Sequence, residues 1–255
     1  MFGLFGKSRF LEEDLEDWFL ETWAWLMSQS GGMARMRNTP LVTPTVEFFL
    51  RTEAVGHERA LHIFECIRSL MGLRAWDCEL VPYERPDAHA RVAEYNYVRN
   101  AAAPNGTFQI RDGKATIRYA ADLVGDPWSL VATLSHELAH YRLALIGDLG
   151  PGGREAHELT TELAVAHAGF AVFSANRAFS FAQHQDAWGQ GWQSSRNGYF
   201  SERTWAFALA LFLMLRGEEG AADRLIKPII KTMTKSATQY LKRHDELIAP
   251  LKAIP

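Results

Sequence analysis

The sequence has little cysteine, no excess charge of one sign and no long apolar run. Its two cysteines, Cys66 and Cys78, are too few for a disulfide framework, which favours a reduced, cytoplasmic protein. The formal net charge is -3, so no broad basic surface is expected and nucleic acid is a poor candidate partner. The longest apolar run, residues 205–215, is about half of the roughly 20 residues that a membrane span needs. Residues 1–10 lack the apolar core of a signal peptide. We therefore expect neither a secreted protein nor a membrane-spanning one.

What is present is typical of a globular chain. The 255 residues are 47% hydrophobic and 22% charged, enough apolar material for one large domain. There is no internal repeat and no low-complexity segment. We expect a single domain over residues 1–255, with a mixed α/β lobe over residues 1–122 and a helical, metal-binding lobe over residues 123–255.

Hydrophobic periodicity predicts a mostly helical α+β fold. Helices are predicted from apolar residues at helical spacing or from residues typical of helix starts and stops. The predicted helices cover residues 10–28, 54–71, 126–146, 155–176, 202–215 and 221–247. Gly31-Gly32 should end the first helix, and Pro228 should interrupt the last. Extended or strand-like passages are expected at residues 39–50, 78–83 and 91–98.

The strongest strand signal is a hairpin over residues 107–120. Asp112-Gly113 lies between two runs of alternating apolar and polar residues, a combination typical of a two-residue hairpin turn. Asp126-Pro127 follows, a favoured N-cap residue with proline at the first helical position. The pattern predicts a small antiparallel sheet that directly precedes a long helix.

That helix carries an H-E-x-x-H pentapeptide from His136 to His140. Residues four apart lie on one helix face, so both imidazoles can reach one metal ion. Glu137 lies beside that face and can hold a water molecule without ligating the metal. The pattern indicates a zinc site with a general base.

A catalytic zinc site needs a third protein ligand and one open position. The next helix offers His157, Glu158 and Glu162, and a short glycine-rich loop joins it to the first, so the two helices should be antiparallel neighbours. Glu158 and Glu162 are one turn apart. One carboxylate can therefore meet the metal while the other accepts a proton from a ligating histidine.

With the pentapeptide and the glutamate helix together, the chain resembles the zincin metallopeptidases, specifically the gluzincins that include thermolysin-like enzymes. The resemblance covers about residues 126–176, one fifth of the chain. It implies a zincin-like fold, to which the helices expected over residues 202–215 and 221–247 are additional. It also implies that Glu158, 18 residues after His140, is the third zinc ligand, and that Glu162 takes the place of an aspartate in the family pattern E-x-x-x-D.

The expected function is therefore a zinc metallopeptidase acting on peptide or protein substrates. Glu137 would take a proton from a zinc-bound water and deliver it to the leaving amine. Tyr199 and His167 are candidates for a further transition-state donor. The strand over residues 114–120 resembles in position the zincin edge strand that pairs with an extended substrate. The alternative is a catalytically inactive zincin-fold binding or regulatory protein with a structural metal.

Overall fold

A computed structural model describes residues 9–85, 104–182 and 200–255 of the chain. Contacts divide the chain into two compact units, one of Met1–Thr43 with Leu143–Pro255 and one of Pro44–Arg142. Helices dominate the described residues, and the strands among them form one three-stranded sheet. The predicted class, α+β and mostly helical, is confirmed. The expected organisation as one domain with lobes meeting at residue 122 stays a prediction, and the contact division keeps the hairpin and most of the metal-motif helix in one unit.

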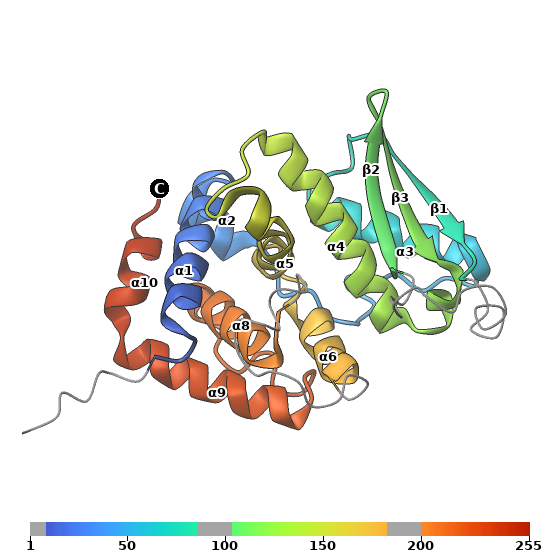
Figure 1. The fold of residues 1–255 in the computed structure, drawn as a ribbon. Helices are drawn as coiled ribbons and strands as arrows, with labels where there is room; N and C mark the ends of the chain where they lie inside the picture. Colours follow the sequence, from blue (N-terminus) through green and yellow to red (C-terminus); the bar gives the residue numbers. More distant parts are fainter. Residues whose placement is uncertain (1–8, 86–103, 183–199) are drawn as a thin grey trace, which may run out of the picture. The chain divides into compact units, whose positions relative to one another are not determined.

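The unit Pro44–Arg142 contains the sheet (Figure 1). Its elements are α3 (Gly56–Leu70), β1 (Cys78–Tyr83), β2 (Gly106–Arg111), β3 (Lys114–Ala120), the short 3-10 helix η2 (Ala121–Gly125) and most of α4 (Pro127–Ile146). The strand order is β1-β3-β2, with β3 antiparallel to β2 and parallel to β1. The expected strand over residues 78–83 is confirmed, whereas the one over residues 91–98 lies outside the described residues.

The β2–β3 hairpin forms as predicted. Its two turn residues, Asp112 and Gly113, have φ angles of 51° and 76°. Positive φ at both central positions gives a turn whose twist matches that of the flanking strands, and glycine and aspartate tolerate this conformation best. The register that follows pairs Arg111 with Lys114 and Gly106 with Tyr119.

Two expectations about this sheet are wrong. The sheet is mixed rather than purely antiparallel, because β1 pairs with β3 in parallel. The segment 114–120 is therefore the central strand, with both of its edges already paired, so it cannot be the edge that receives an extended peptide. Each residue of β1 pairs with a residue of β3 that lies more than thirty positions later in the chain. The alternation of apolar and polar residues within one strand does not predict such a distant pairing.

One face of the sheet is packed and the other is polar. On β3 the side chains of Ala115, Ile117 and Tyr119 are buried, whereas Lys114 and Arg118 are exposed. Period-two alternation of this kind is typical of a sheet that packs on one face only. Helix α3 contacts β1, and Gly106 of β2 lies against α4. The hairpin and the metal-motif helix thus form one packed assembly.

The other unit is helical. Its elements are α1 (Glu13–Ser28), α2 (Gly32–Asn38), the 3-10 helix η3 (Gly153–Ala156), α5 (His157–His167), α6 (Ala171–Ala182), α8 (Glu202–Arg216), α9 (Pro228–Arg243) and α10 (Asp245–Lys252). Helix α8 is buried almost all round, as its apolar run predicts, and it contacts α2, α5, α6 and α9 (Figure 1). The Ser201 hydroxyl accepts a hydrogen bond from the Thr204 N–H and caps the helix as expected of a serine there.

The long helix expected over residues 155–176 is two helices. Gly169, with φ of 90°, separates α5 from α6, and its carbonyl accepts a hydrogen bond from the Val42 N–H. A Cβ on this glycine would lie 2.0 Å from the Pro40 carbonyl oxygen. The break is a Schellman motif, because the Gly169 N–H donates to the Ala166 carbonyl at 3.0 Å and the Phe170 N–H to the Val165 carbonyl at 3.1 Å. Glycine is the local signal for this ending, and the fit against Pro40 adds a tertiary contact to it.

Other boundaries also differ from expectation. Residues 39–50 contain bends and turns but no strand. Residues 221–226 form turns and a bend, so that helix α9 begins at Pro228 rather than being interrupted there. The short helix α2 was not expected at all, because Gly31-Gly32 predicts only a stop. Proline at the first position of α9 is compatible with helix because its missing N–H would have no intrahelical partner.

Candidate metal centre

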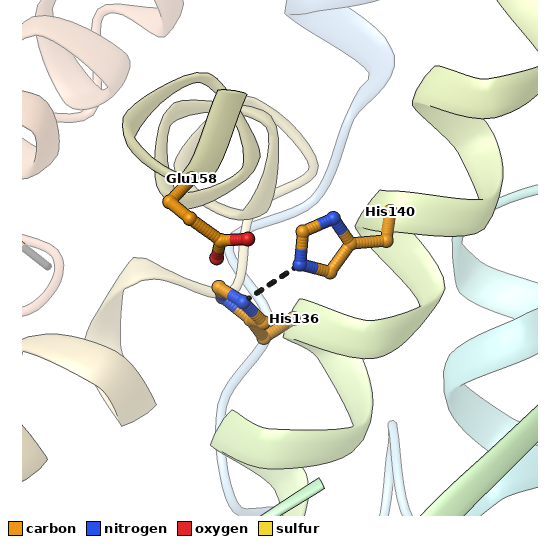
Figure 2. A group of neighbouring side chains, drawn as sticks. All are labelled: His136, His140 and Glu158. Carbon is orange, nitrogen blue, oxygen red and sulfur yellow. Dashed lines mark hydrogen bonds between the residues drawn. The ribbon is translucent and has the colours of Figure 1, made fainter. Parts of the chain in front are cut away.

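The two histidines of the pentapeptide lie in the middle of α4. The helix begins where predicted, with the Asp126 carboxylate accepting a hydrogen bond from the Ser129 N–H at 3.2 Å. The Nε2 atoms of His136 and His140 are 3.1 Å apart, and their rings meet edge to face at 82° (Figure 2). Two nitrogens bound to one tetrahedral zinc at about 2.05 Å would be roughly 3.3 Å apart. The two ring nitrogens form a hydrogen bond with each other, at a separation close to that of two ligands of one metal ion.

Glu158 supplies the third candidate ligand atom. It lies in the first turn of α5, and a carboxylate oxygen of this residue and the ligand nitrogens of His136 and His140 all lie within 4.8 Å of one another. In Figure 2 its carboxylate points toward the two rings. Two imidazole nitrogens and one carboxylate oxygen are a common donor set of catalytic zinc, which leaves the fourth position for water or substrate. The donor chemistry thus fits a divalent metal ion.

The other two ligand candidates on this segment lie differently. Among the described residues, the group that could hold a metal contains Glu158 but neither Glu162 nor His157. Glu162 is buried, with 6% of its surface exposed, whereas Glu158 is exposed. A buried carboxylate needs polar partners to offset its lost hydration. Its expected role, accepting a proton from a ligating histidine, stays a prediction.

Glu137, the expected general base, is also buried. Only 6% of its surface is exposed, and its side chain lies against the first residue of β2, Gly106. Burial shields the carboxylate from bulk water, and its position next to His136 on the helix keeps it beside the ligand pair. This location is compatible with a base acting on a water molecule at the open metal position.

Strand β2 supplies neighbours to this helix that the sequence pattern does not predict. The Phe108 ring lies parallel to the His140 imidazole, at 1° and a centroid distance of 6.4 Å, and it also contacts Tyr141. Gly106 and Phe108 are two positions apart, so their side-chain positions face the same side of the strand. The alternation in the hairpin could have shown that these two residues share a face, but not which helix covers it.

The structure bears on only one of the two candidates for an additional donor, and Tyr199 stays a prediction. Tyr199 lies outside the described residues. His167 is buried at the end of α5, with its ring edge on to Trp23 of α1 at 5.7 Å. It is nine residues from Glu158 on the same helix, a rise of about 13 Å. His167 therefore packs in the helical core.

Neither cysteine has the properties of a nucleophile. Burial raises the pKa of the Cys66 thiol and raises the pKa of Cys78 to about 11. Because the thiolate is the reactive form, both residues stay as thiols near neutral pH. Cysteine-based catalysis thus has no support in this chain, and the carboxylate–imidazole group on α4 and α5 is the chemically equipped site among the described residues.

Comparison with protein-family models, with curated proteins and with solved structures finds no match to this chain. Within the described ranges, no helix has both the length and the apolar character needed to cross a membrane.

Proposed function

We propose that this protein is a zinc-dependent metallopeptidase of the zincin type, with the glutamate-helix arrangement of the gluzincins. The observation that carries the proposal is the convergence of His136, His140 and Glu158, with their ligand atoms within 4.8 Å of one another. The adjoining Glu137 adds what a purely structural metal site does not need, a carboxylate placed to move protons.

In the proposed reaction, His136, His140 and Glu158 hold the metal ion. When bound, zinc would acidify a water molecule and polarise the carbonyl of the scissile bond. Glu137 accepts the proton of the attacking water on its carboxylate and then donates it to the leaving nitrogen. Glu162 orients one of the ligating imidazoles by accepting its other N–H. The proposed substrate is a peptide or protein.

The first experiment measures metal content and hydrolysis in parallel. Protein purified without added metal should contain close to one zinc per chain by elemental analysis. It should cleave members of a peptide library, lose this activity on chelation and recover it when zinc is restored. Glu137→Gln should retain the zinc but cleave at least about 10²-fold more slowly, because an amide is nearly isosteric with the carboxylate but cannot accept the proton.

The outcomes separate the proposal from its alternative. Cleavage by Glu137→Gln at the wild-type rate would contradict the assigned base. Stoichiometric zinc without cleavage of any peptide, together with a fourth protein ligand in a crystal structure of the zinc form, would instead support the inactive zincin-fold binding protein. Absence of zinc binding would overturn both.

A further inference from the structure

Strand β2 contacts the metal-motif helix through two residues on one face. Gly106 and Phe108 pair across the hairpin with Tyr119 and Ile117 of β3, both of which are fully buried. Directly paired residues of antiparallel strands point to the same side of the sheet, so Gly106 and Phe108 face the packed side. In the described sheet β2 is an edge strand. Its packed face meets the pentapeptide at two separate points.

The first contact is between aromatic rings. Phe108 lies parallel to His140, and its ring centroid is 5.4 Å from that of Tyr141. Tyr141 is itself fixed, because its hydroxyl donates to the Asp77 carbonyl at 3.0 Å and the edge of Trp76 meets its ring at 5.7 Å. Phe108 therefore has a rigid neighbour on one side and can restrict the rotation of the His140 imidazole on the other. A ligand ring held in one orientation loses less entropy when the metal binds.

The second contact is a close approach of backbone to side chain. A Cβ built on Gly106 would lie 2.8 Å from Oε1 and 2.9 Å from Cγ of Glu137, and 2.7 Å from Cγ2 of Thr133. Real Cβ atoms do not approach other atoms so closely, so a side chain here would have to displace its neighbours. The Glu137 carboxylate is the flexible end of a long side chain and would move first. Gly106 has no positive φ, so glycine is required here because there is no room for a side chain and not because of the backbone conformation.

We propose that Gly106 and Phe108 are positioning residues, through which β2 fixes the general base and one metal ligand separately. The inference depends on the proposed function for its chemical meaning. Gly106 sets where the Glu137 carboxylate lies, and Phe108 sets the orientation of His140. The two residues should therefore have separable effects: a change at Gly106 affects the hydrolytic step, and a change at Phe108 affects the metal.

The test compares two variants with matched controls. Gly106→Ala is paired with Gly125→Ala, since a Cβ on Gly125 would meet no atom within 4 Å and its φ is not positive. Phe108→Leu is paired with Ile110→Ala, which lies on the same face of β2 but is 51% exposed. The readouts are zinc affinity by chelator competition, the visible spectrum of the cobalt-substituted protein, kcat and KM on a cleaved library peptide, and crystal structures.

Gly106→Ala should leave zinc affinity within about twofold of wild type and lower kcat by roughly 10²-fold with little change in KM, because a displacement of about 1 Å at a reacting group has that effect. Its crystal structure should show the Glu137 carboxylate displaced and the two histidines in place. Adding Thr133→Ser removes the Cγ2 methyl but not the conflict with Glu137, so the double variant should stay slow. Recovery of kcat in the double variant would show that the new side chain acts by displacing Thr133 rather than Glu137. That result would overturn the role assigned to Gly106.

Phe108→Leu should weaken zinc binding by roughly tenfold, the lower end of the effect of residues that orient metal ligands. It should also change the cobalt spectrum, while Ile110→Ala changes neither. Equal zinc affinity in the two variants would overturn the role of Phe108.

Failure of the proposed function gives a different result. If the wild-type protein binds no zinc or cleaves no peptide, the proposed metallopeptidase function fails as described above. The positioning inference is then decided by the crystal structures alone. An unmoved Glu137 in Gly106→Ala, or an unmoved His140 in Phe108→Leu, overturns it.

Discussion

The helices α4 and α5 both supply ligands to the candidate metal centre, but the sequence specifies them in different ways. On α4, the spacing of His136 and His140 places both imidazoles on one face whatever the rest of the chain does. On α5, the position of Glu158 depends on the loop before the helix and on the packing after it. The ligand pair is a local property of one helix, whereas the third ligand is a consequence of tertiary structure. Mutations should therefore disrupt the ligand pair on α4 and the third ligand on α5 in different ways.

Contacts within the helical unit hold the α5 region at both ends. Before the helix, the indole N–H of Trp18 donates to the Pro151 carbonyl at 3.0 Å, and the Trp25 ring packs on Gly150. After the helix, Gly169 fits against Pro40. The comparison predicts that changes in α4 act directly on metal binding. Changes around α5 should act through the fold.

The largest effect is expected for His140→Ala. Loss of one of two imidazoles from a three-ligand site should lower zinc affinity by more than about 10²-fold, beyond the usual effect of residues that only orient a ligand. The fold should persist, because the side chain is only half-buried and helix α4 tolerates alanine. Elemental analysis and circular dichroism measure the two properties. Equal zinc in the variant and the wild type would remove His140 from the site.

Gly169→Ala should have the largest effect on stability. Its Cβ would meet the Pro40 carbonyl oxygen at 2.0 Å, and its φ of 90° is unfavourable for alanine, so the free energy of unfolding should fall by about 3 kcal/mol or more. Gly217→Ala is the control, since it has a φ of 72° but no atom within 4 Å of the added Cβ. It should cost about 1–2 kcal/mol, the cost of the backbone conformation alone. Denaturant unfolding of both variants measures the difference. Equal losses would show that packing against Pro40 does not fix the end of α5.

Glu158→Gln should weaken zinc binding by roughly tenfold to a hundredfold, because a neutral amide oxygen is a poorer ligand than a carboxylate. The matched control is Glu155→Gln, an exposed glutamate of η3 that precedes the same helix. It should leave zinc affinity unchanged. Chelator competition measures both variants.

The zinc affinity of Glu162→Gln, compared with that of Glu158→Gln, tests which of the two glutamates binds the metal. If Glu162 orients a ligating histidine, its loss should weaken zinc binding less than that of Glu158. A larger loss from Glu162→Gln than from Glu158→Gln would reverse the two assignments. A crystal structure of the zinc form would then show a Glu162 oxygen about 2.0–2.2 Å from the metal.

The smallest effect is expected for Trp18→Phe. The phenyl ring keeps most of the packing but cannot donate to the Pro151 carbonyl, so stability should fall by about 1 kcal/mol. Zinc affinity should fall by less than in Glu158→Gln. Hydrogen exchange over residues 150–157 should be faster than in wild type. Unchanged exchange would mean that this hydrogen bond does not hold the loop.

Local signals were sufficient for much of this structure. Asp112-Gly113 predicts the hairpin turn and Asp126-Pro127 predicts the start of α4, because each pair of residues has the backbone conformation that the turn or helix start requires. The buried helix α8 follows from its apolar run. Long-range pairing was not predictable: the parallel pairing of β1 with β3 makes β2 an edge strand. The end of α5 at Gly169 has a local signal, a glycine with positive φ in a Schellman motif, and only the fit of this glycine against Pro40 depends on tertiary packing.

The candidate site divides in the same way. By itself the sequence determined the H-E-x-x-H helix, since an α-helix repeats every 3.6 residues and brings positions 136 and 140 to one face without any tertiary contact. It also limited the third ligand to a few residues of the next helix. The family resemblance implied Glu158 among these, but only the tertiary structure brings its carboxylate near the two imidazoles. Only the tertiary structure, too, placed Gly106 and Phe108 against Glu137 and His140. The physical reason is that these contacts join separate elements, and their geometry depends on the packing of whole helices and strands rather than on the spacing within any one of them.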